Sequence, residues 1–117
     1  MRRFKELEVW KVARRLSRAA YVLTKSRSLR GHFEIQNQVR RAAISIPANL
    51  AEGYGLGTRP QLVRCMRISL GSAYELETHL ELIKDLDLAP ADHVEQALAD
   101  CRQQIGLLIG TLRGLGA

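Results

Sequence analysis

The chain has 117 residues, a length typical of one domain, and we expect residues 1–117 to fold as a single unit. Its composition, 46% hydrophobic and 26% charged, excludes a disordered or fibrous protein, and no apolar run approaches the roughly 18 residues of a membrane-spanning helix. The net charge of +6 is uneven: residues 1–41 carry 12 Lys/Arg against 3 Asp/Glu, whereas residues 42–117 carry 6 against 9. Such asymmetry steers a polyanion towards the basic half, or pairs neighbouring subunits head to tail.

Helical periodicity runs through most of the chain. In residues 7–26 the apolar positions step by 4, 3, 4 and 3, and they are Val9, Ala13, Leu16, Ala20 and Leu23. The same rhythm returns in residues 59–88 and in residues 91–115. A mean step of 3.5 is typical of helices that pack with a left-handed supercoil. We therefore predict an all-α, antiparallel, up-down-up-down four-helix bundle.

The second helix contains a proline in its middle. Val39, Ala43, Ile46 and Leu50 step by 4, 3 and 4, and this register passes through Pro47 without a change of phase. We therefore predict one helix over residues 33–54 that is kinked near Pro47 and does not end there. Proline lacks the amide that would bond the Ala43 carbonyl, so Ser45 or a neighbouring helix is expected to satisfy the backbone nearby.

The predicted helix ends have recognisable signals. "YGLG" supplies glycines for the end of the second helix and for a turn, and "TRPQ" has the pattern of a capping box. In that box Thr58 is the N-cap, Pro60 lies in the first turn and Gln61 is the third residue. Pro90 marks the start of the fourth helix.

Three segments of the chain carry a family likeness. They are "LEVWKVARRLSRAAYVLTK", "QVRRAAISIPANLAEGYG" and "GSAYELETHLELI". In order and spacing these segments resemble the four-helix-bundle proteins encoded in the intervening sequences of bacterial 23S rRNA genes, some of which carry the name S23 ribosomal protein. The resemblance implies a compact bundle that assembles into a homopentamer, but it implies no defined activity. The chain is more distantly similar to the accessory variability determinant of diversity-generating retroelements, a pentameric bundle that engages RNA and a reverse transcriptase.

A basic helix face suggests nucleic acid as a partner. Lys11, Arg14, Arg18 and Lys25 share one face of the first helix, away from its apolar stripe. Cations spaced in this way neutralise phosphates through counterion release without reading bases. The alternative is an ordinary solvated face. The RNA-binding hypothesis covers Arg2, Arg3, Lys5, Lys11, Arg14, Arg15, Arg18, Lys25, Arg40 and Arg41.

The paired arginines have two interpretations. Arg40 and Arg41 point about 100° apart on a helix, so they do not serve one partner equally. They form a clamp for phosphate, or they pair with Glu52, Glu75 or Glu77 within or between subunits. Structural pairing is the preferred interpretation.

Several small and aromatic residues suggest close packing. Small residues that each weaken an isolated helix are expected to allow close approach of neighbouring backbones, and they are Gly71, Ser72, Ala73, Gly106 and Gly110. Trp10 and Tyr74 fill complementary space or anchor a subunit contact. Whether these contacts lie within one chain or between subunits is left open by the sequence.

Catalytic and metal-binding patterns are missing from the sequence. It has no nucleophile elbow, no phosphate-binding glycine loop and no repeated Glu-x-x-His motif, although Glu75 and His79 lie four residues apart. Cys65 and Cys101 fall on apolar seams at different heights, and we predict that they form no disulfide. We expect no enzyme activity, no cofactor and no metal.

These observations together predict a function. We expect a cytoplasmic, non-enzymatic, oligomeric protein, pentameric by its resemblance, that binds RNA, with ribosomal RNA as a candidate, through the basic surface. The alternative is an interaction scaffold whose charge asymmetry serves self-assembly or an acidic protein partner. No membrane partner is expected.

Overall fold

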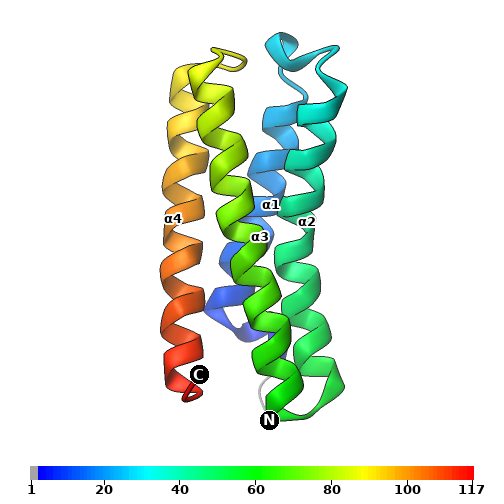
Figure 1. The fold of residues 1–117 in the computed structure, drawn as a ribbon, viewed down its shortest axis with the longest axis vertical. Coiled ribbons are helices and arrows are strands. Elements are labelled where there is room, and N and C mark those ends of the chain that lie inside the picture. Colours follow the sequence, from blue (N-terminus) through cyan, green and yellow to red (C-terminus); the bar gives the residue numbers. More distant parts are fainter. Residues whose placement is uncertain (1–2) are drawn as a thin grey trace.

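The computed structural model describes residues 3–117 as four long helices in an antiparallel bundle (Figure 1). The helices are α1 (Glu8–Thr24), α2 (Phe33–Leu56), α3 (Arg59–Asp85) and α4 (Ala91–Gly114). Two short 3-10 turns, Phe4–Glu6 and Arg27–Leu29, precede α1 and α2, and the described residues contain no strand. The bundle measures 44 × 20 × 20 Å. The prediction of an all-α four-helix bundle is confirmed.

The core follows the predicted 3.5-residue register. In α1 every residue of the Val9–Leu23 stripe is buried, and the α2 stripe from Val39 to Leu50 is buried throughout. In α3 and α4 the predicted stripe positions are buried except Leu62 and Leu115, which are half-buried at the open ends. Because all four stripes meet on one axis, the opposite face of each helix is left to solvent.

Helix α2 runs through Pro47 without interruption, as predicted. The partner of the Ala43 carbonyl comes from α1, where the hydroxyl of Ser17 donates a hydrogen bond to that oxygen. A neighbouring helix thus replaces the amide that Pro47 lacks. Ser45 has a different role, because its Oγ accepts from Ser72 Oγ at 2.8 Å and from Asn49 Nδ2 at 2.9 Å.

A second serine crosses from α3 to the same part of α2. The buried hydroxyl of Ser69 donates to the Ile46 carbonyl at 2.9 Å. Serines of α1 and α3 therefore hold the α2 backbone from two sides, immediately before the proline. These bonds fix the relative heights of three helices, since each requires one serine to face one carbonyl.

The boundary between α2 and α3 agrees with its sequence signals. Gly57 adopts a left-handed conformation (φ 81°) at the C-cap of α2, and Thr58 is the N-cap of α3. The Thr58 oxygen accepts from the Gln61 amide at 3.4 Å, and its hydroxyl donates to Gln61 Oε1 at 2.7 Å. The Gln61 side chain thus bonds the Thr58 hydroxyl, a variation on the predicted capping box.

The glycine prediction is wrong within the chain. A Cβ atom at Gly71, Gly106 or Gly110 would meet nothing within 4 Å, so these glycines face outwards. Gly53 has the role expected of them, since a Cβ there would lie 2.9 Å from Cys65 Cβ. Helices α2 and α3 approach closely at Gly53, near the short connection that joins them.

We predict that the Ser17 hydroxyl matters only while Pro47 is present. The Ser17→Ala substitution leaves the Ala43 carbonyl without a hydrogen-bond donor and should lower the free energy of unfolding by about 1–3 kcal/mol. In a Pro47→Ala background the restored amide bonds the same carbonyl, and the cost of Ser17→Ala should fall below about 1 kcal/mol. Urea unfolding of the four proteins in this cycle measures the difference. Ser28→Ala, at an exposed position, is the control. An equal cost of Ser17→Ala in both backgrounds would contradict the assignment.

Candidate nucleic-acid interface

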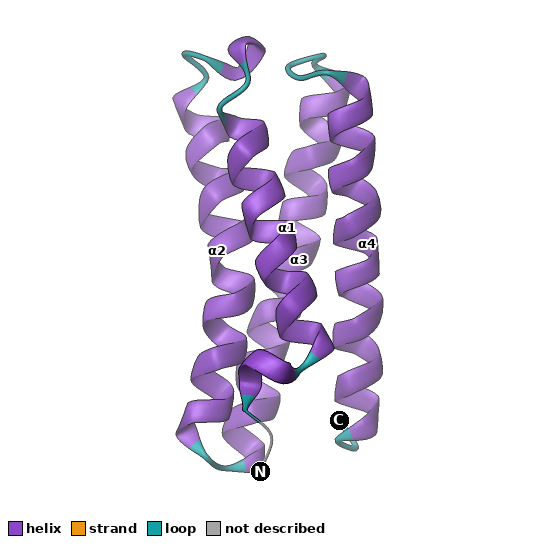
Figure 2. Ribbon diagram, turned by 180° about the vertical axis from the view of Figure 1, so that it is seen from behind, coloured by secondary structure: helices purple, strands orange, loops and turns teal. Residues whose placement is uncertain are grey.

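The outer face of α1 carries most of the predicted basic residues. Lys11, Arg14, Arg15 and Arg18 are all exposed, because the opposite side of the helix supplies the buried stripe. Figure 2 shows α1 in front of α3, between α2 and α4, with its outer face turned to the viewer. The cations are therefore presented along one edge of the bundle and not distributed around it.

A cleft of about 510 Å³ lies on the first half of this face. Its lining contains five cationic side chains, a tryptophan and one carboxylate, namely Lys5, Glu8, Trp10, Lys11, Arg14, Arg15 and Arg18. Cations grouped in this way produce a positive potential that attracts phosphate groups. The structure thus brings together five of the ten predicted residues at one place.

Trp10 contacts two neighbouring side chains at this cleft and holds them in place. Phe4 packs edge-on against the Trp10 ring, with centroids 5.3 Å apart, and so holds the first 3-10 turn against α1. This packing brings Lys5, which lies next to Phe4, to the cleft. The Arg14 guanidinium lies over the same ring, 5.6 Å from its centroid. The sequence suggested Trp10 as a packing residue, and its cation–π contact depends on the i, i+4 spacing to Arg14.

The single carboxylate in the cleft leaves most of the positive charge uncompensated. Glu8 Oε1 lies 3.9 Å from Arg15 Nη2, and both side chains are largely exposed. Ion pairs of this type contribute little to stability and are screened by salt. The cleft therefore keeps a positive charge that a polyanion can use.

Arg40 has a structural role that differs from the predicted pairing. Its Nε donates to Thr24 Oγ1 at 2.8 Å, and its guanidinium lies 4.5 Å from the centroid of the Tyr21 ring. The buried Thr24 hydroxyl in turn donates to the Tyr21 carbonyl at 2.6 Å. Arg40 therefore ties α2 to the last turn of α1. Of the glutamates proposed as its partners, Glu77 bonds Arg102, with 3.2 Å between Arg102 Nε and Glu77 Oε2.

Arg41 is exposed and lies apart from the α1 cleft. It lines a separate hollow of about 920 Å³ between α2 and α3, together with Arg40, Glu34 and Glu75. Because carboxylates share this hollow, its charge is mixed. The structure therefore separates Arg40 and Arg41 from the basic cleft.

The remaining predicted residues lie around these two sites. Arg3 is exposed before the first 3-10 turn, and Arg2 lies outside the described residues. Lys25 follows the last residue of α1, with its Nζ 5.7 Å from the centroid of the Tyr21 ring. Tyr21 is thus shared by Lys25 and Arg40, a contact that the sequence did not suggest.

Comparison with known proteins identifies the family. Residues 5–110 match the family model described as "23S rRNA-intervening sequence protein". The chain belongs to this family. A solved structure of a protein with unknown function from the S23 ribosomal protein family of Bacteroides thetaiotaomicron has the same fold, with a TM-score of 0.78 and 22% sequence identity. The match covers 89% of this chain and 97% of that one. None of the curated proteins compared matches the chain.

The family resemblance expected from the sequence is therefore confirmed. Its most specific segment, Arg40 to Gly53, contains both Pro47 and the closely packed Gly53. The more distant resemblance to the accessory variability determinant stays a prediction.

Both cysteine side chains of the chain lie inside the bundle. Cys65 and Cys101 are buried free thiols. Cys101 Sγ donates to the Ala73 carbonyl at 3.2 Å, and burial, helped by the nearby Glu77 charge, raises its pKa to about 12. A thiol with so high a pKa is a poor nucleophile near neutral pH.

One histidine and one glutamate lie close together in the described residues 3–117. His79 Nε2 lies 3.4 Å from Glu75 Oε1, but in this part of the chain no three His, Cys, Asp or Glu side chains gather into a metal-binding group. Among the same residues, no helix has both the length and the apolarity needed to cross a membrane.

The two adjacent arginines should differ in their effect on stability. Arg40→Ala removes the bond to Thr24 and the contact with Tyr21, and should lower the free energy of unfolding by about 1–2 kcal/mol. Arg41→Ala, at an exposed position, should change it by less than about 0.5 kcal/mol. Thermal or urea unfolding of both variants makes the comparison. Equal effects of the two substitutions would contradict the structural role of Arg40.

Proposed function

We propose that this protein is a non-enzymatic, oligomeric RNA-binding protein of the cytoplasm, and that RNA binds along the outer face of α1. The observation that carries the proposal is the cleft where five cationic side chains gather beside one carboxylate. Phosphate contacts require no base-specific geometry, so a helix face of this kind suits structured RNA of varied sequence. The family description refers to 23S rRNA, and ribosomal RNA is therefore the first RNA to test.

Arg40 and Arg41 are secondary in this proposal. Arg40 already contacts Thr24 and Tyr21, and the hollow beside Arg41 contains Glu34 and Glu75. Lys11, Arg14 and Arg18 have larger roles, because they line the cleft in which positive charge exceeds negative charge. Assembly of several copies would multiply this field around the oligomer.

Self-association is supported by an apolar area on the α2–α3 side. Ile44 is 51% exposed and lines the hollow that contains Ser45 and Ser72. Ile68, 42% exposed, lies one helical turn before Ser72 on α3. Gly71, which faces open space, adds a position where another backbone can approach. Exposed aliphatic side chains beside such a glycine suit a contact between subunits.

RNA binding should depend on the α1 cleft and on salt. Affinity for a structured fragment of 23S rRNA should fall about five-hundredfold between about 50 and 200 mM salt for roughly five phosphate contacts. The triple variant Lys11→Glu, Arg14→Glu, Arg18→Glu should abolish binding, as measured by fluorescence anisotropy.

A charge-matched control separates the cleft from net charge alone. Arg30→Glu, Arg59→Glu and Arg113→Glu together lower the net charge by the same six units, from +6 to zero, but at exposed sites outside α1 and away from Ile44 and Ile68. This control should retain most of the RNA affinity. Equal loss in both triple variants, or no RNA binding by the wild type, would contradict the proposal.

Oligomerisation should depend on the α2–α3 surface. Five copies of the 13.1 kDa chain would have a molar mass of about 66 kDa in size-exclusion chromatography with light scattering. Ile68→Glu should shift the protein towards the 13.1 kDa monomer, because a buried unpaired carboxylate opposes the contact. Leu86→Glu, at a residue that is 58% exposed near the end of α3, should leave the mass unchanged. A monomeric wild type, or an unchanged mass for Ile68→Glu, would count against this surface.

A further inference from the structure

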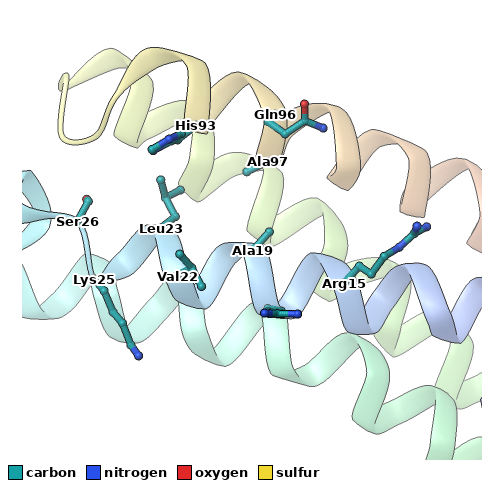
Figure 3. Close-up of a pocket in the computed structure, with 10 residues that line it drawn as sticks. Arg15, Ala19, Val22, Leu23, Lys25, Ser26, His93, Gln96 and Ala97 are labelled. Carbon is teal, nitrogen blue, oxygen red and sulfur yellow. The ribbon is translucent and has the colours of Figure 1, made fainter.

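A second groove lies on the other half of α1, against α4. It has a volume of about 650 Å³. Figure 3 shows that its lining residues come from these two helices and from Lys25 and Ser26, which follow α1. Ala19 and Leu23 of α1 and Ala97 of α4 form its floor, while Val22 lies on the α1 side. The groove exists because small side chains, Ala19 and Ala97, stand where larger ones would fill the space between the helices.

Positively charged side chains border this apolar floor on its α1 side. Arg15, Arg18 and Lys25 belong to the lining, and in the described part of the chain the lining contains no carboxylate. In Figure 3 Arg15 extends towards α4 at one end, whereas Lys25 points away from α4 at the other. The α4 side contributes the uncharged Gln96 and a histidine, His93. The cations therefore lie along one edge, on α1.

An unpaired hydroxyl stands at the end of the groove. Ser26 Oγ is buried and has no hydrogen-bond partner within the described residues, and Ser26 belongs to the lining. A buried hydroxyl without a partner is destabilising, so an acceptor that bonds it would be favourable there. The groove thus offers an apolar floor, a cationic edge and a hydrogen-bond donor.

The shape and openness of the groove favour a helix as its occupant. Val22 is 61% exposed, so solvent reaches the groove along its side. Arg15 and Lys25 are ten residues apart, which corresponds to about 15 Å or nearly three helical turns. A smaller cleft between α1 and α4, lined by Val12, Leu16, Asp100 and Gln103, shares Arg15 and extends the same interhelical surface. The carboxylate among these residues, Asp100, accepts a hydrogen bond from Gln96 on the α4 side. A helix can lay a broad apolar face on such a surface.

Other occupants fit less well. A nucleic acid gains little from an apolar floor, because its phosphates need cations and its bases need stacking partners. A fatty acid would leave much of its chain in water, whereas small-molecule sites usually bury most of their ligand.

We propose that the α1–α4 groove binds an acidic amphipathic helix of a partner protein. Its apolar side chains, spaced at i, i+4 and i+7, pack on Ala19, Val22 and Ala97. Acidic side chains along one flank face Arg15 and Arg18, and uncharged polar side chains face Gln96. Ser26 donates to a carboxylate or carbonyl oxygen at the end of that helix once its hydroxyl, buried in the free protein, turns towards the groove. This site differs from the RNA site, although Arg15 and Arg18 border both.

A designed peptide tests the proposal. The probe is a helical peptide of about 21 residues with leucines at the a and d heptad positions, glutamates along one flank and glutamines along the other. Its affinity for the full chain is measured by fluorescence anisotropy. The same peptide with lysines in place of glutamates, and a scrambled peptide of the same composition, are compared. Only the glutamate peptide with its continuous apolar face should bind.

Val22→Asn is the decisive variant. It removes the exposed apolar contact without a change of charge, and should weaken binding of the glutamate peptide about tenfold. Leu82→Asn, at an exposed leucine of α3 (45%), is the matched control and should bind as the wild type does. RNA affinity should be the same in both variants, so failure of the groove proposal is distinguishable from failure of the RNA proposal.

Any one of several results would overturn the proposal. They are no binding of the glutamate peptide, equal binding of the scrambled peptide, equal peptide affinities of Val22→Asn and Leu82→Asn, a loss of RNA affinity in Val22→Asn equal to its loss of peptide affinity, and binding of laurate in place of the peptide. A change in molar mass caused by Val22→Asn would also overturn it, because the occupant would then be a second copy of this chain.

Discussion

The Ala43 carbonyl, left without an amide by Pro47, is the constraint on which the arrangement of the bundle depends. Helix α2 continues through the proline because Ser17 of α1 supplies the missing donor. That bond forms only at one height of α1 along α2 and at one rotation of α1 about its own axis, and packing of the apolar stripes holds α1 there. With Ser17 facing α2 and the buried stripe facing the core, Lys11, Arg14 and Arg18 lie on the solvent side. The hydrogen bond that Pro47 requires and the outward direction of the charged face therefore depend on the same orientation of α1.

The basic residues differ in what remains available for a ligand. Arg40 contacts Thr24 and the ring of Tyr21, so its guanidinium contributes mainly to the junction of α1 and α2. On α1, the only carboxylate in the cleft is opposite Arg15 at a distance typical of a weak, exposed pair. Two glutamates of α3, Glu77 and Glu81, are meanwhile paired with one cation of α4, because Arg102 bonds both of them. The two signs of charge are therefore separated in space, with the positive excess concentrated on α1.

Local periodicity predicts much of this fold, whereas contacts between distant residues escape it. The unbroken register at Val39, Ala43, Ile46 and Leu50 is enough to show that Pro47 lies inside a helix, and the pattern around Thr58 marks the start of α3. Ser17 could not be assigned to the Ala43 carbonyl, because the relative heights of two helices depend on packing along their whole length. The glycines show a related limit: a helix glycine indicates lost stability but not the direction it faces, so the sequence neither singled out Gly53 nor showed that Gly71 faces away from the other helices of its own chain. The α1–α4 groove, likewise, arises where Ala19 meets Ala97, which no local pattern reveals.

The packing of Trp10 has a spectroscopic consequence. It is the only tryptophan in the chain, and its indole lies between Phe4 and the guanidinium of Arg14 at the basic cleft. A phosphate that draws Arg14 away would change the polarity and quenching around that ring, so the emission of the protein reports directly on events at this end of α1. The α1–α4 groove has a different lining that does not include Trp10 in the described residues. We therefore expect the fluorescence of the unlabelled protein to change more when a ligand binds at the basic cleft than when one binds in the α1–α4 groove.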